Sequence, residues 1–136
     1  MFIYGSVEER SMEEHLLEHI MSMHRASIDS AARDESSLLD TIRDEGCIPS
    51  MIVGGSYIDD TFEKAAYYLH RVATRHPFVE GNKRTAFLLA ATIIYSETGS
   101  FLSEDAEEND RFIRYVASDL SDVREIEAWL REHVIR

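Results

Sequence analysis

Apolar side chains recur at intervals of three and four residues over two ranges in the first part of the chain. Residues 12–24 carry Met12, Leu16, Ile20 and Met23. Residues 59–75 place six apolar side chains on one helical face, namely Phe62, Ala65, Ala66, Leu69, Val72 and Ala73. This spacing predicts two amphipathic helices, and Asp59, Asp60 and Thr61 supply cap and first-turn signals for the second.

The second half of the chain continues the helical pattern. Residues 85–95 are apolar on nearly all sides, which predicts a buried central helix that stops at Gly99. Two amphipathic helices should follow. The first would carry Phe112, Ile113, Val116 and Leu120, and the second Val123, Ile126, Trp129, Leu130 and Val134. The predicted fold class is therefore all-α, a helical bundle.

Residues 46–58, with the sequence GCIPSMIVGGSYI, interrupt this pattern. They contain half of the glycines and one of the two prolines, mixed with β-branched residues. Such a mixture predicts a loop or a short hairpin. No linker, internal repeat or low-complexity tract divides the chain, so residues 1–136 are predicted to form a single domain.

The formal net charge of -12 argues against a nucleic-acid partner, because affinity for DNA and RNA comes mainly from Lys and Arg side chains that neutralise phosphates. The single cysteine, Cys47, excludes an internal disulfide bond. The first residues lack a basic segment followed by an apolar run, and no window holds the ~18 consecutive apolar residues of a membrane span. We therefore expect a cytoplasmic protein with protein or small-molecule partners.

The residues with most chemical potential lie together in HPFVEGNKRTA, residues 76–86. His76 precedes Pro77, which disfavours helical angles, so the preceding helix should end near Arg75 and present the imidazole from a loop. With an ordinary pKa of about 6.5, a histidine can accept a proton from an attacking hydroxyl at neutral pH. The carboxylate of Glu80 suits Mg²⁺, which prefers oxygen ligands.

The end of the same loop is suited to an anion. Gly81 permits a tight turn, after which free amides at the start of the next helix favour negative charge. Asn82 adds a neutral donor, and Lys83 and Arg84 add two positive charges for phosphate. A base, a metal ligand and an anion cradle are the parts that phosphoryl transfer requires. The alternative is a structural loop in which His76 caps a helix and the cations are simply solvated.

This loop resembles the signature of the Fic/Doc (filamentation and death-on-curing) family, approximately H-x-F-x-[DE]-[AG]-N-[GK]-R. Every constrained position of the pattern is matched. The stretch LLDTIRDEG at residues 38–46, the loop after it and the helix that leads to His76 also resemble Doc-like members.

The resemblance implies an all-α Fic fold with the loop at the N-terminus of the central helix. In such a fold His76 would deprotonate a hydroxyl of a target protein, Phe78 would anchor the loop in the core, and Glu80 would hold Mg²⁺. The phosphates of ATP would be bound by Asn82, Lys83 and Arg84. Residues 46–58 fall where the family carries its flap, a hairpin that docks the target by strand addition.

The residue between Asn82 and Arg84 divides the family. Members that transfer AMP have glycine there, whereas Doc-like kinases have lysine, as this chain does at Lys83. The resemblance thus implies a protein kinase toxin that moves the γ-phosphate of ATP to a Ser or Thr of a target, which for Doc-like relatives is a translation elongation factor. The implied partner is a small antitoxin with a tail that wraps the toxin. A basic segment in that partner would suit a negatively charged surface on this chain.

Two residues depart from the Doc-like pattern. Glu80 stands where Doc-like kinases have Asp, and Gly81 is more usual in AMP-transferring members. Two alternatives therefore stay open, AMP transfer to a protein hydroxyl and a catalytically inactive relative that binds a nucleotide or a partner. A nuclease is disfavoured by the net charge and by the absence of a carboxylate cluster.

Other patterns are weaker. His15 and His19 are four residues apart with His24 nearby, as in a zinc pair, but no third ligand has a fitting spacing, so we predict surface or half-buried histidines and no metal. The stretch TIRDEG fits the inhibitory helix of self-restrained Fic proteins, with Glu45 as its glutamate, and it equally fits the ordinary Doc-like element. Residues 104–110 are predicted to be solvated acidic surface.

Overall fold

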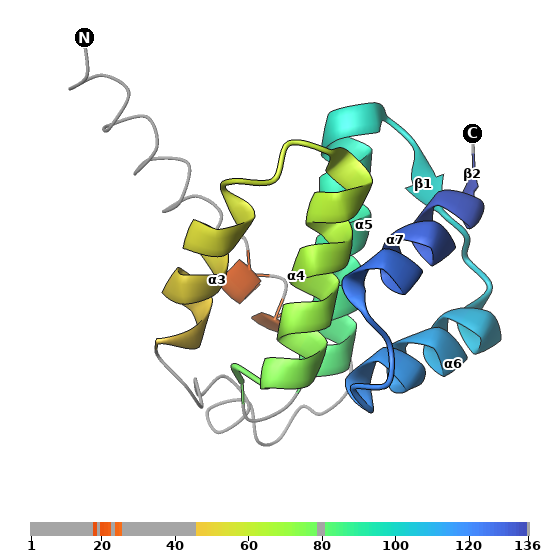
Figure 1. Cartoon of the computed structure of the whole chain (residues 1–136). Coiled ribbons are helices and arrows are strands. Elements are labelled where there is room, and N and C mark those ends of the chain that lie inside the picture. Colours follow the sequence, from red (N-terminus) through yellow and green to blue (C-terminus); the bar gives the residue numbers. More distant parts are fainter. Residues whose placement is uncertain (1–17, 19, 23, 26–45, 79–80, 136) are drawn as a thin grey trace, which may run out of the picture.

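A computed structural model describes Glu18, residues 20–22 and 24–25, and residues 46–78 and 81–135 (Figure 1). With labels as in the figure, the elements are α3 (Cys47–Gly55), α4 (Thr61–Arg75), α5 (Asn82–Thr98), β1 (Phe101–Leu102), α6 (Ala106–Ala117), α7 (Val123–Glu132) and β2 (Val134–Ile135). The described residues before residue 26 are also helical. The all-α prediction is confirmed, because the two strands are only two residues long and form one small antiparallel pair.

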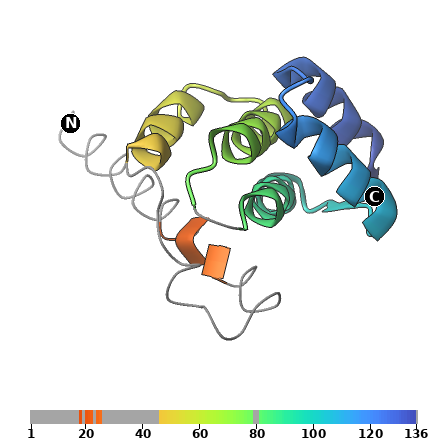
Figure 2. The ribbon, with the colours of Figure 1, turned by 90° about the horizontal axis from the view of Figure 1, so that it is seen from below.

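Helix α4 lies at the centre of the described bundle. It packs side by side with α5, and α3 lies on one flank while α6 and α7 lie on the other, as the view along the helices shows (Figure 2). Five of the six residues predicted for its apolar face are buried, and the sixth, Phe62, is half-buried. Tyr68, which the pattern did not single out, is buried as well.

Helix α5 is buried on one side rather than all round. Seven of its residues are buried, but Leu88 is 40% exposed and Tyr95 is 52% exposed. The helix ends at Thr98, and Gly99 follows in the left-handed conformation, as the sequence predicted. The prediction of a helix buried on nearly all sides therefore overstated the burial of residues 85–95. The other helices pack mainly against α4 and leave one side of α5 exposed.

Residues 46–58 do not form a loop or hairpin, and that prediction is wrong. Nine of them form helix α3, whose buried residues include Ile48, Met51 and Ile52. Gly54 and Gly55 lie inside this helix, where a Cβ atom on either would overlap the Tyr67 or Tyr68 ring of α4. The glycines therefore allow two helices to approach closely and do not mark a turn. A flap that docks a target by strand addition is not present in this segment.

The last two helices are shorter than predicted. Helix α6 ends at Ala117, and Asp119 follows in the left-handed conformation, so Leu120 lies outside the helix and is 73% exposed. Val134 belongs to β2, where it pairs with Leu102. The predictions that placed Leu120 and Val134 on helical faces are therefore wrong, because a turn and a strand pairing interrupt the pattern.

Part of the acidic composition caps helices. The N-cap residue of α4, α6 and α7 is an aspartate whose carboxylate accepts a hydrogen bond from the backbone N–H three residues on, at 2.9 to 3.2 Å. The three pairs are Asp60 with Glu63, Asp105 with Glu108, and Asp122 with Glu125. Each such cap contributes about 1 kcal/mol. The acidic run at residues 104–110 thus has structural contacts as well as solvated side chains.

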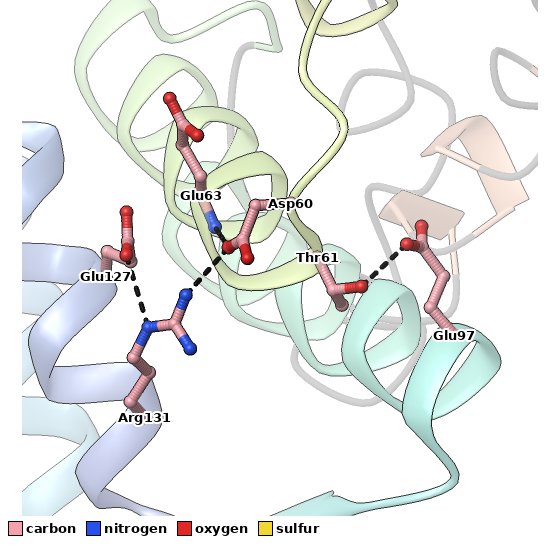
Figure 3. Close-up of polar contacts among 6 residues, drawn as sticks. All are labelled: Asp60, Thr61, Glu63, Glu97, Glu127 and Arg131. Carbon is pink, nitrogen blue, oxygen red and sulfur yellow. Dashed lines mark hydrogen bonds and ion pairs between the residues drawn. The ribbon is translucent and has the colours of Figure 1, made fainter.

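A polar cluster joins the start of α4 to its neighbours, at the opposite end of that helix from His76 (Figure 3). Arg131 of α7 donates to Asp60 at 2.9 Å and to Glu127 at 3.2 Å. Glu97, near the end of α5, accepts hydrogen bonds from Thr61 at 2.8 Å and from Lys64 at 2.9 Å. This cluster therefore links the start of α4 to the end of α5 and to α7. The loop joins α4 and α5 at their other ends.

His133 follows α7 in a column of three stacked rings. Its imidazole lies 3.9 Å from the Trp129 ring, which lies 3.8 Å from that of Phe112. Its Nδ1 is 2.7 Å from the Trp129 carbonyl oxygen, and its Nε2 faces the Glu108 carboxylate. Both partners are acceptors, so the ring donates to both only as the imidazolium. Burial opposes that charge, but the two hydrogen bonds outweigh it and raise the pKa of His133 above 6.5.

We expect His133 to make stability fall as the pH rises. A pKa that is higher in the folded than in the unfolded state adds stability that is complete below about pH 6.5 and is lost as the pH rises through the folded value. Urea denaturation at pH values below and above this transition should show that the free energy of unfolding of the wild type falls by about 1 kcal/mol or less. His133→Gln should lack that loss, and an unchanged pH dependence in this variant would contradict the assignment.

Candidate active site

The loop between α4 and α5 begins at His76, directly after the end of α4 at Arg75, as predicted. His76 has φ 52° and ψ 61°, the left-handed conformation, which costs a residue with a side chain about 1–2 kcal/mol relative to glycine. Such strain persists only where the surroundings impose it, and it is common at functional sites. Its side chain is half-buried, while the following Pro77 and Phe78 are buried.

Phe78 fixes the loop to the interior. Its side chain is fully buried, and its ring stacks on the ring of His24 with the centroids 3.7 Å apart and the planes 13° apart. His24 is itself fully buried. A residue of the N-terminal helical segment therefore forms part of the support on which the loop rests.

Asn82 closes the loop. Its side-chain oxygen accepts a hydrogen bond from the Phe78 N–H at 3.0 Å, and its side-chain nitrogen donates to the Phe78 carbonyl at 2.9 Å. The side-chain amide of Asn82 thus pairs with both backbone groups of Phe78, in the way that the backbone of a neighbouring strand would. Asn82 itself is buried. The sequence suggested a phosphate donor at this position, and the structure adds a positioning role. An amide nitrogen has two N–H groups, so one is left to donate to a ligand.

The start of α5 has the features of an anion site. Gly81 precedes the helix with φ 80°, a conformation that glycine adopts without strain. It has no side chain to cap the helix, and the first turn holds no acidic residue. Lys83 and Arg84 are exposed in that turn. The helix dipole and these two cations together favour a negatively charged ligand.

Several predicted residues lie outside the described part of the chain. They are Glu80, the predicted metal ligand, Glu45 of the TIRDEG stretch, and His15 and His19. Within the described ranges, no group of three His, Cys, Asp or Glu side chains could hold a metal ion. Mg²⁺ is usually held by one or two carboxylates together with substrate phosphates. One carboxylate beside the anion site at α5 would fit that pattern.

The contact between His24 and Phe78 was not predicted. Sequence spacing grouped His24 with His15 and His19, because a stack between residues 54 positions apart leaves no local signal. An apolar-pattern argument applied to residues 12–24 would place His24 beside Ile20, which is also fully buried. That proximity on one helix face was the only available hint.

We expect His24→Ala to loosen the loop selectively. The change removes a stacked ring and leaves a cavity, at a cost of about 2 kcal/mol. In hydrogen exchange, the buried Phe78 N–H should lose protection in this variant and keep most of it in His24→Phe, which retains a ring. Val116→Ala, a truncation in the core of α6, is the matched control. Equal loss of Phe78 protection in Val116→Ala would show that only global stability matters.

A model of the Fic/DOC family matches residues 11–94, which is more than half of the chain and includes the whole loop. No curated protein matches the chain. In the described part of the structure, no helix has the length and apolar composition needed to cross a membrane.

Proposed function

The chain belongs to the Fic/DOC family, whose members are generally transferases that act on proteins, and we propose that it transfers the γ-phosphate of ATP to a Ser or Thr hydroxyl of a target protein. The proposal combines the geometry of the loop with the chemistry of its side chains. His76 is the general base, and the start of α5 is the site for the nucleotide phosphates.

The base and the anion site are held by one short segment. Asn82 hydrogen-bonds to both backbone groups of the buried Phe78, which ties the residues after His76 to the first turn of α5. Phosphoryl transfer depends mainly on positioning and charge stabilisation, and these bonds serve the first while the cations at the start of α5 serve the second. Mg²⁺, held by Glu80 and the phosphates, would supply further charge neutralisation when bound.

The proposal that phosphate, and not AMP, is the transferred group rests on Lys83. It is exposed in the first turn of α5, directly after Asn82. In the AMP-transferring members of the family, glycine at the corresponding position leaves room for the terminal phosphates of ATP in the pose for AMP transfer. A lysine there opposes that pose and places a cation near the transferred group. AMP transfer remains the second candidate, because Gly81 follows the pattern of AMP-transferring members.

We further propose that the protein is the toxin of a toxin–antitoxin pair, with a translation elongation factor as its target. The support is the likeness of the loop to Doc-like members together with the net charge of -12. An antitoxin with a basic segment would complement this charge. The setting of such a pair is the cytoplasm.

Labelled ATP tests the proposed reaction. The protein is incubated with Mg²⁺, a translation extract and ATP that carries its label on either the γ- or the α-phosphate. We expect one protein band to acquire the γ-label only. A band with the α-label would establish AMP transfer instead. Tight ATP binding by calorimetry with no labelled protein would favour an inactive relative.

A further inference from the structure

The stretch of chain around the loop has more positive than negative residues, although the protein as a whole is acidic. Between residues 65 and 96 the chain has four cations, Arg71, Arg75, Lys83 and Arg84, and the single acid Glu80. Lys83 and Arg84 belong to the anion site on α5. The other two lie on α4, where they lead up to His76, and the proposed reaction has so far assigned them no role.

Arg71 and Arg75 are four residues apart, so they lie on one face of α4, and we name them the arginine stripe. The Arg71 guanidinium lies over the Tyr67 ring, 5.2 Å from its centroid, and contacts His70 Nδ1 at 3.3 Å. Arg75 is exposed and directly precedes His76. The stack on Tyr67 holds the Arg71 guanidinium in place without neutralising its charge.

Neither arginine forms an ion pair with a carboxylate among the described residues. Three other cations do, since Lys64 pairs with Glu97, Arg114 with Asp110, and Arg131 with Asp60 and Glu127. The carboxylate of Asp119 faces His70 Nε2 at 3.4 Å. Burial, and then the positive charge of Arg71, lower the pKa of His70 despite Asp119, and Arg75 acts in the same direction. The two arginines of the stripe therefore lie on a face of α4 where, among the described residues, no carboxylate pairs with either of them.

We propose that the arginine stripe docks an acidic segment of the target protein next to the hydroxyl that His76 deprotonates. This inference rests on the proposed function, because it takes His76 as the point of reaction. Four residues of helix span about 6 Å, which is close to two residues of an extended chain. The stripe therefore fits an extended segment with acidic side chains two positions apart. The nucleotide has its own cations at the start of α5.

Peptide binding tests the docking separately from catalysis. A fluorescent peptide with a Thr flanked by alternating glutamates is titrated with His76→Ala protein, and a second peptide carries lysines in place of the glutamates. We expect binding of the acidic peptide only. Reversing both charges, Arg71→Glu with Arg75→Glu, should weaken it about tenfold or more. The matched control is Arg111→Glu with Arg124→Glu, which changes two exposed arginines on α6 and α7 by the same net charge.

The outcomes separate the possible failures. No binding of the acidic peptide, or an equal loss in the control pair, would overturn the docking surface. In active protein, the stripe variant should raise the KM for the acidic peptide and leave the KM for ATP unchanged, and the opposite result would assign the stripe to the nucleotide. If the wild type transfers nothing while selective peptide binding persists, the proposed function fails and the docking surface stands.

Discussion

Replacing His76 with alanine is expected to lower the rate of transfer by about 100- to 10,000-fold, the usual contribution of a general base. The loss should appear in kcat and leave ATP binding largely unchanged, because the anion site lies at the start of α5. His76→Gly should be equally inactive, since neither residue can accept a proton.

Glycine usually makes a folded chain less stable than alanine does at the same position, and for these two variants we expect the reverse. His76 is left-handed, so His76→Gly should be more stable than His76→Ala by about 1 kcal/mol in urea denaturation. A pair that ranks the other way would contradict the left-handed conformation. Residual transfer within a few-fold of the wild type in both variants would show that His76 is not the base.

Replacing Asn82 with alanine should damage both stability and transfer. The change leaves the buried N–H and C=O of Phe78 without their partners, at a cost of about 2 to 4 kcal/mol in total. Because these bonds close the loop, the position of His76 relative to α5 should be lost too. We expect transfer to fall about 100-fold or more at a temperature where the variant is still folded.

Asn109→Ala is the matched control for Asn82→Ala. Its side chain lies on α6, outside the loop, and donates one hydrogen bond, to the Ser103 carbonyl at 2.8 Å. This variant should lose stability and keep its rate of transfer. If both asparagine variants lowered the rate equally, loop closure by Asn82 would not explain the effect.

The sequence predicted those elements whose signals are local. The period of apolar residues and the Asp60 cap located α4, Pro77 located its end, and Gly99 located the end of α5. The loop could also be recognised from the sequence, because the predicted base, glycine and cations all lie within residues 76–84. The left-handed angle of His76 was not predicted, since Pro77 indicated only that the helix stops.

Contacts between distant segments were beyond such reasoning. The glycines of α3 suggested a turn because the rings of Tyr67 and Tyr68 that approach them lie on another helix. The support of Phe78 by His24 and the pairing of Val134 with Leu102 are also long-range. The hydrogen bonds between Asn82 and Phe78 were not predicted either, although these residues are only four positions apart, because the residue type of Asn82 had suggested a phosphate donor.

The intact mass of the modified target tests the central claim most directly. The target protein is purified after incubation with Mg-ATP and either the wild type or His76→Ala, and its mass is compared with that of the untreated protein. We predict a gain of one phosphate with the wild type and no gain with the variant. A gain of one AMP, or a gain of phosphate that persists in His76→Ala, would contradict the account.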